Sequence, residues 1–228
     1  LERDGAPWLT IDCGAEGLSH YLSHYGEMPR ALFITHVHLD HVAGFERLFV
    51  ATYFDPARRG KVKVYVPATV VPLLHQRIGD YPNVLAEGGV NFWDAFQVIP
   101  VGASFWHDGV RLEVFPARHH WPETAYGLRL HGSVVWTGDT RPIPEVLAKF
   151  ADAGELIAHD CSLHGNPSHS GIDDLEREYP VELLQRCVLY HYASAADGEA
   201  LVARGHRVAH PGEVIALQDT TAARIPPP

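Results

Sequence analysis

The chain is poor in cysteine and in positive charge, and both shortages limit what it can be. Only three cysteines occur among 228 residues, Cys13, Cys161 and Cys187, and none of them forms a CxxC pair. So sparse and odd a set argues against a disulfide framework and a structural zinc knuckle, and it fits a reducing compartment. With 18 Lys and Arg against 28 Asp and Glu, the net charge of -10 is unfavourable for general nucleic-acid binding.

Long apolar runs are absent as well. No stretch approaches the roughly 20 residues that span a bilayer and no signal peptide is visible, so we expect a cytoplasmic protein without membrane contact. Arg58, Arg59, Lys61 and Lys63 form a basic run, which we interpret as a solvated turn before a strand. The expected partner is therefore a small-molecule substrate, and the sequence leaves the oligomeric state, a homodimer included, open.

The apolar content suits one sizeable domain. Hydrophobic residues make up 46% of the chain and charged residues 20%, which argues against disorder and favours a single domain over residues 1–228. Because no partner strand precedes Trp8 in the pattern, the sequence suggests that a first strand lies upstream. Aromatic residues concentrate at 91–108, where we expect core or dimer packing rather than a surface that stacks a base.

Apolar strands alternate with helices, and polar residues follow the ends of many strands. The pattern predicts strands at 8–12, 31–35, 61–66, 110–115, 126–130, 133–136, 155–159 and 187–190, and helices at 41–50, 69–78 and 194–203. Metal-competent side chains stand just past the ends of six strands: Asp12, His36, His119, Asp139, Asp160 and His191. Strand ends deliver side chains to one rim of a layered α/β fold, so we predict that these six gather there.

The most informative segment is HVHLDH, which carries His36, His38, Asp40 and His41 within six residues. Zinc accepts imidazole nitrogens and carboxylate oxygens, usually from four ligands. His36 and His38 are two apart on an extended segment, so they point the same way and can share one metal. Asp40 and His41 belong to the following turn and can face a second metal, as two-metal hydrolases require.

This segment resembles the signature of the metallo-β-lactamase superfamily, and the rest of the chain resembles that superfamily's other motifs in the right order. The other segments are LTIDCG with Asp12, FPARHHWPETAYGLRL with His119, VVWTGDT with Asp139 and CVLYHYAS with His191. The resemblance spans nearly the whole chain. It implies an α/β fold, a four-layer αββα sandwich of two mixed β-sheets with the metals at one edge.

The resemblance also implies a ligand set for two zinc ions, with manganese or iron as the other metals to consider. The first zinc would be held by His36, His38 and His119, the second by Asp40, His41 and His191, and Asp139 would bridge the two. His120 competes with His119 for its role, although Pro122 and the Phe115-Pro116 lead-in favour His119. Asp12 would not bind the metal itself but would orient one of the ligand histidines.

Asp160 in IAHDC and His169 in PSHS resemble a pair in the phosphodiesterase branch of the superfamily, which includes the tRNA-processing endonuclease RNase Z. That branch usually has Glu in place of Asp160. The resemblance implies that the carboxylate positions a histidine that protonates the leaving oxygen. Asp40, Asp139, Asp160 and His169 are therefore the predicted catalytic residues. In an alternative interpretation His169 caps the helix after Gly171, and His159 is expected to be a satisfied buried polar group.

These motifs predict a metallo-hydrolase that activates water, and a small phosphodiesterase fits best. A β-lactamase is disfavoured because that branch typically has Cys or Ser where Asp139 stands. A tRNA-processing enzyme is disfavoured because too few residues separate His119 from Asp139 to hold a long basic arm. The alternatives are a carboxylic ester, thioester or lactone hydrolase, an iron-dependent oxidoreductase such as a sulfur dioxygenase, and a non-catalytic binding protein.

Overall fold

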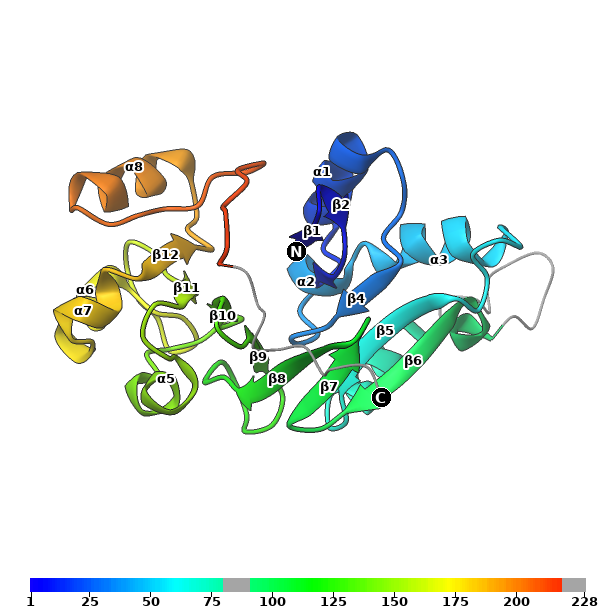
Figure 1. Ribbon diagram of the computed structural model, residues 1–228, viewed down its shortest axis with the longest axis horizontal. Helices are drawn as coiled ribbons and strands as arrows, with labels where there is room; N and C mark the ends of the chain where they lie inside the picture. The colour runs from blue at the N-terminus through cyan, green and yellow to red at the C-terminus, as the bar shows by residue number, and fades with distance from the viewer. Residues whose placement is uncertain (80–90, 219–228) are drawn as a thin grey trace. The chain divides into compact units, whose positions relative to one another are not determined.

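The structure is a computed structural model that describes residues 1–79 and 91–218, and the chain divides into two compact units. The N-terminal unit comprises residues 1–101 and the C-terminal unit residues 102–228. Each unit contains its own main β-sheet (Figure 1). No described helix is both long enough and apolar enough to cross a membrane. A single domain over the whole chain remains a prediction.

The N-terminal unit is built on a parallel sheet with the strand order β3 (Thr10–Ile11), β4 (Ala31–Phe33), β5 (Val62–Pro67) and β6 (Phe96–Val101). Parallel neighbours need crossover connections, and helices supply them. α1 (Ala15–Tyr25) joins β3 to β4, and α2 (Leu39–Val42) and α3 (Phe45–Tyr53) join β4 to β5 (Figure 1). The other elements among the described residues of this unit are β1 (Glu2–Arg3), β2 (Ala6–Pro7), α4 (Val71–Leu74), the π-helix η1 (His75–Gly79) and the 3-10 helix η3 (Phe92–Ala95).

Aromatic side chains fill the core of the N-terminal unit. The Phe92 ring stacks on Phe49 with 5.1 Å between centroids, and Phe96 meets Phe45 edge-on at 5.7 Å. Core packing is thereby confirmed for Phe92 and Phe96, and Phe105 in the C-terminal unit is also buried.

The C-terminal unit is built on a mixed six-stranded sheet. Its order is β12 (Cys187–Tyr190), β11 (Leu156–Asp160), β10 (Val134–Trp136), β9 (Tyr126–Leu130), β8 (Val110–Pro116) and β7 (Ser104–His107). Neighbours from β7 to β10 are antiparallel, whereas β10, β11 and β12 run parallel. The helices are α5 (Pro144–Phe150), α6 (Ile172–Glu178), α7 (Val181–Leu184) and α8 (Ala195–Ala203).

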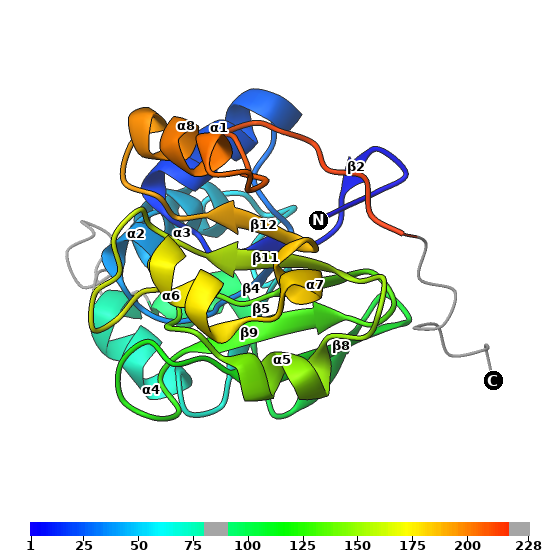
Figure 2. The same ribbon diagram turned by 90° about the vertical axis from the view of Figure 1, so that its left-hand side faces the viewer.

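Helices α5, α6 and α7 lie over one face of this sheet (Figure 2). Leu147 of α5 and Leu175 of α6 are fully buried in one cluster with Ile157 of β11 and Leu189 of β12, and Leu183 and Leu184 of α7 are partly buried against it. Burial of apolar area on this face holds the strand ends in place. The loops that leave β8, β10, β11 and β12 carry the polar residues discussed below.

The predicted α/β class is confirmed, and each predicted strand lies close to an observed one. β6 and β7 were not predicted, and the described N-terminal sheet is parallel rather than mixed as expected. The predicted helix at 41–50 is instead split into α2 and α3 around Gly44. A Cβ atom at Gly44 would lie 2.7 Å from the Cys13 carbonyl oxygen, so backbone packing sets this break. The predicted helix at 69–78 is α4 followed by the π-helix η1. α6 is the helix expected after Gly171, whereas α1, α5 and α7 were not expected from the pattern.

Burial on the helix-covered face of the C-terminal sheet predicts how much stability is lost when a core side chain is shortened. We expect Leu175→Ala to lower the free energy of unfolding by about 2–5 kcal/mol, because it leaves a cavity beside Ile157 and Leu189. Urea denaturation followed by circular dichroism measures this change. Val181→Ala is the control, because that side chain is 64% exposed and should change stability little. Equal effects of the two substitutions would contradict the core assignment.

Candidate metal centre

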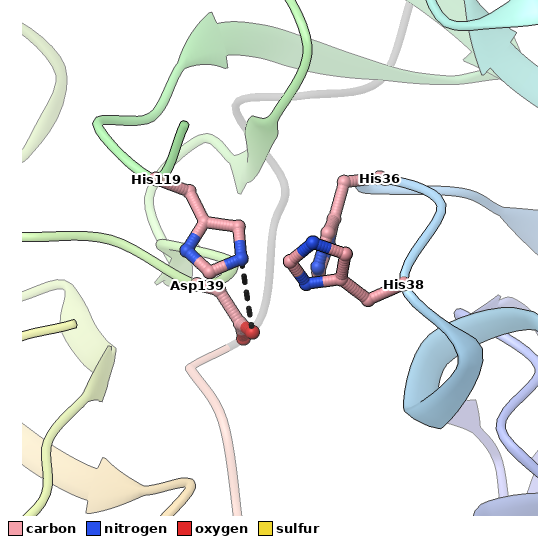
Figure 3. Close-up of side chains that lie close together, drawn as sticks. All are labelled: His36, His38, His119 and Asp139. Carbon is pink, nitrogen blue, oxygen red and sulfur yellow. Dashed lines mark ion pairs between the residues drawn. The ribbon is translucent and has the colours of Figure 1, made fainter. Parts of the chain in front are cut away.

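Three imidazole rings gather in the loop and helix that follow β4. His36 and His38 have ring centroids 4.7 Å apart, and His36 and His41 have centroids 4.1 Å apart. Figure 3 shows the rings of His36 and His38 turned toward each other from one short segment. His38 has extended backbone angles at the start of α2, as expected if His36 and His38 point the same way.

Asp12, just after β3, orients two of these rings. Its Oδ2 accepts hydrogen bonds of 2.7 Å from His41 Nδ1 and from the Thr35 hydroxyl. The Thr35 hydroxyl donates its only proton to Asp12, so it must be the acceptor in the 3.0 Å hydrogen bond with His36 Nδ1. Both rings therefore carry their proton on Nδ1. The Nε2 lone pairs of His36 and His41 are left for a cation, and His41 Nε2 lies 3.5 Å from Asp40 Oδ2.

Asp12 holds this position because its loop is joined backbone to backbone with α2. The Cys13 amide donates to the His41 carbonyl at 2.7 Å, and the Cys13 carbonyl accepts from the Gly44 amide at 2.8 Å. A Cβ atom at Gly14 would lie 1.8 Å from the Asp40 carbonyl oxygen, so only glycine permits this approach. Asp12 itself has a φ of 63°, in the left-handed region, which turns its carboxylate back toward His41.

In the C-terminal unit, the strand ends bring two histidines to one buried carboxylate. Asp139, just after β10, is 1% exposed. His119 Nε2 lies 3.8 Å and His191 Nε2 3.4 Å from Asp139 Oδ2, and Figure 3 marks the first of these pairs. His191, just after β12, has a φ of 69°, so left-handed backbone geometry occurs at this strand end too.

These donors fit a metal ion. His119 Nδ1 donates to the Ser168 carbonyl at 2.9 Å, which leaves a lone pair on Nε2 facing the Asp139 carboxylate. Burial lowers the pKa of His119 to about 4, so the ring is neutral near pH 7. A neutral nitrogen lone pair and a carboxylate repel each other unless a cation lies between them. Imidazole nitrogens and a carboxylate are ligands that zinc, manganese and iron all accept.

Of the two adjacent histidines, the structure places His119 rather than His120 against Asp139. His119 is 2% exposed, whereas His120 is exposed and its Nδ1 lies 3.5 Å from the Ser168 hydroxyl. The two rings are 4.2 Å apart, so His120 packs on the outer side of His119.

Asp160 and His169 form the predicted pair. His169 Nδ1 and Asp160 Oδ2 are 2.8 Å apart, and the Thr140 amide donates to the same oxygen at 2.8 Å. Burial raises the pKa of Asp160, and the hydrogen bond from His169 opposes that rise. The capping alternative for His169 is wrong, because Asp174 Oδ2 accepts from the Gly171 amide at the start of α6. His159 is a satisfied buried residue as expected, bonded to Tyr179 Oη and to the Asp160 carbonyl.

Sequence reasoning missed the residues that orient the ligands through hydroxyls and carbonyls. Thr35 and Ser168 act in this way, and neither stands in a pattern typical of metal chemistry. A hydroxyl directly before His36 was the one available signal.

Comparison with known proteins defines the family. The family model described as "Anti-Pycsar protein Apyc1" matches residues 2–215. The chain belongs to this family. A relative with the same name, from Paenibacillus harenae, is 28% identical over 205 residues, which cover 86% of this chain and 83% of the relative. Outside the Apyc1 name, a Ribonuclease Z of Mycobacterium sp. (strain KMS) is 28% identical over 175 residues, which cover 69% of this chain and 60% of the relative.

The solved structures show the fold of this Apyc1-family chain. The metallo-β-lactamase fold protein YhfI from Bacillus subtilis superimposes with a TM-score of 0.65 at 16% identity, over 92% of this chain and 87% of that chain. The predicted metallo-β-lactamase fold is thereby confirmed. The chain is a hydrolytic enzyme, as the sequence predicted, and its His and Asp clusters can bind metal.

Because Asp12 orients both His41 and Thr35, replacing it should lower the affinity of the site for metal. We expect Asp12→Asn to weaken zinc binding about 10- to 100-fold, because the amide no longer fixes the Nδ1 proton of His41 and the hydroxyl proton of Thr35. Competition with a chromophoric chelator measures the dissociation constant. Asp173→Asn, whose side chain is 73% exposed, is the control. Unchanged affinity in Asp12→Asn would contradict the orienting role.

Proposed function

We propose that this protein is a metal-dependent phosphodiesterase that uses two zinc ions to activate water against a small phosphodiester, cyclic or short and nucleotide-like. The observation that carries the proposal is the buried Asp139 carboxylate, which His119 and His191 approach through Nε2 within the C-terminal unit. The Ribonuclease Z relative supports phosphodiester chemistry over carboxylic ester, thioester or lactone hydrolysis. We further propose a cytoplasmic location and a small-molecule substrate rather than nucleic acid or a membrane.

The proposed ligands are those that the superfamily resemblance implies. His36, His38 and His119 would hold the first zinc, Asp40, His41 and His191 would hold the second, and Asp139 would serve both. The Nδ1 hydrogen bonds of His36, His41 and His119 support this assignment, because they leave each Nε2 as a ligand. When bound, the two ions supply a water that ionises near neutral pH and stabilise charge on the phosphoryl oxygens.

The chain's own residues handle the protons. Asp139 holds a negative charge beside the reacting water and can accept its proton. His169 is held by Asp160 through Nδ1, which leaves Nε2 to protonate the leaving oxygen. The His169 ring stacks on His191 with 5.0 Å between centroids and meets His119 edge-on at 4.6 Å, so it lies beside two of the proposed ligands.

A chromogenic diester tests the proposed reaction. We expect the purified protein to cleave bis-p-nitrophenyl phosphate, and we expect exhaustive chelation to abolish the cleavage because no side chain replaces the metal-activated water. Zinc added back should restore the rate. Release of nitrophenolate measures turnover, and elemental analysis of protein purified without added metal gives the ion content.

The alternatives have distinct outcomes in the same assay. Full activity after chelation in metal-free buffer would contradict a metal-dependent mechanism. Near-stoichiometric iron with oxygen uptake would favour the oxidoreductase instead. A matched panel of a phosphodiester, a thioester and a lactone identifies the bond that is cleaved.

The Asp160–His169 pair predicts a dependence on the leaving group. We expect His169→Ala to slow the hydrolysis of a cyclic nucleotide, whose leaving group is an alkoxide, by about 10²-fold or more, since a general acid contributes that much. The hydrolysis of bis-p-nitrophenyl phosphate, whose leaving anion is stable, should slow less, and the zinc content of the protein should not change. His164→Ala, an exposed histidine in the same loop, is the control. Equal slowing of both substrates would remove His169 from the acid role.

A further inference from the structure

Thr140 takes no part in the proposed chemistry, yet it is hydrogen-bonded to three of the segments that carry site residues in the C-terminal unit. It directly follows Asp139 and is fully buried, at 0% exposed. Its partners belong to the segments of His119, Asp160 and His169, which come from β8, β11 and the loop before α6.

The side chain of Thr140 connects the Asp139 segment to the His119 segment. Its Oγ1 accepts a 2.9 Å hydrogen bond from the Arg118 amide and donates a 2.7 Å bond to the Arg141 carbonyl. The Arg141 amide in turn donates to the Arg118 carbonyl at 2.9 Å. Because Arg118 directly precedes His119, these bonds fix the backbone from which the His119 ring reaches Asp139.

The backbone of Thr140 connects the Asp139 segment to His169, the proposed general acid. Its amide donates to Asp160 Oδ2, the oxygen that holds His169. Its carbonyl accepts from the Ser170 amide at 3.0 Å and from the Ser170 hydroxyl at 2.8 Å, and Ser170 directly follows His169. Hydrogen bonds to Thr140 therefore hold both the segment of the proposed metal ligand His119 and the segment of the proposed general acid His169.

We propose that Thr140 is a positioning residue whose hydroxyl sets the register of His119 against Asp139, while its backbone sets that of His169. The catalytic part of this inference rests on the proposed phosphodiesterase function, and the metal-binding part does not. Removing the hydroxyl while keeping the side-chain shape leaves the Arg118 amide without its acceptor. The His119 backbone then loses its fixed distance to Asp139.

The test compares Thr140→Val with Thr140→Ser. We expect Thr140→Val to weaken zinc binding about 10- to 100-fold, as supporting residues of metal ligands typically do, and to lower kcat more than it changes KM. Thr140→Ser keeps the hydroxyl and should stay close to wild type in both measurements. Thr52→Val is the matched control, because Thr52 is also fully buried, lies in α3, and has no hydrogen-bond partner for its hydroxyl among the described residues.

Zinc affinity is measured by chelator competition and folding by circular dichroism and thermal unfolding. Equal zinc affinity in Thr140→Val and wild type, or equal losses in Thr140→Val and Thr140→Ser, would overturn the proposal. If the wild type cleaves no diester, the proposed function fails, and the zinc comparison still decides the role of the Thr140 hydroxyl.

A second variant applies if Thr140→Val does not fold. Ser170→Ala removes only the hydroxyl bond to the Thr140 carbonyl and should lower cleavage of an alkoxide-leaving diester without changing zinc affinity. Unchanged cleavage in Ser170→Ala would overturn the link between Thr140 and His169.

Discussion

The whole arrangement depends on which nitrogen of each imidazole carries the proton. A neutral histidine has one donor nitrogen and one lone pair, so the partner of Nδ1 decides what Nε2 can bind. Asp12, Thr35 and the Ser168 carbonyl make that choice for His41, His36 and His119. Without these partners the same rings would present a mixture of tautomers, and a cation would have to compete with protons for them.

The fold supports this choice by placing polar residues where strands end. Asp139 and His191 follow β10 and β12, and Asp160 is the last residue of β11. These three strands are parallel, so their ends lie at one edge of the C-terminal sheet. The left-handed backbone of Asp12 and His191 is uncommon for such residues, and the surrounding hydrogen bonds must offset its cost. Strain of this kind is tolerated where side-chain direction matters more than local stability.

Much of this could be predicted from the sequence, because strand periodicity and the HVHLDH segment are local patterns. The orienting role of Asp12 and the Asp160–His169 pair also came from motifs, and the structure places these residues within hydrogen-bond distance of their partners. Thr140 and Ser168 could not be predicted, since their contacts join segments far apart in the chain. Helices α5 and α7 were missed because they are short, and α1 was missed although Leu18, Tyr21, Leu22 and Tyr25 follow regular helical spacing.

The backbone pairing of Cys13 with His41 and Gly44 has a kinetic consequence. These hydrogen bonds close between main-chain groups, so they hold Asp12 and α2 together whether or not an ion is present. A binding loop that is ordered beforehand pays no entropy of ordering when its ligand arrives. Loading of the N-terminal ligands should therefore proceed at the pace at which the ion sheds its hydration water, and not at the pace of loop rearrangement.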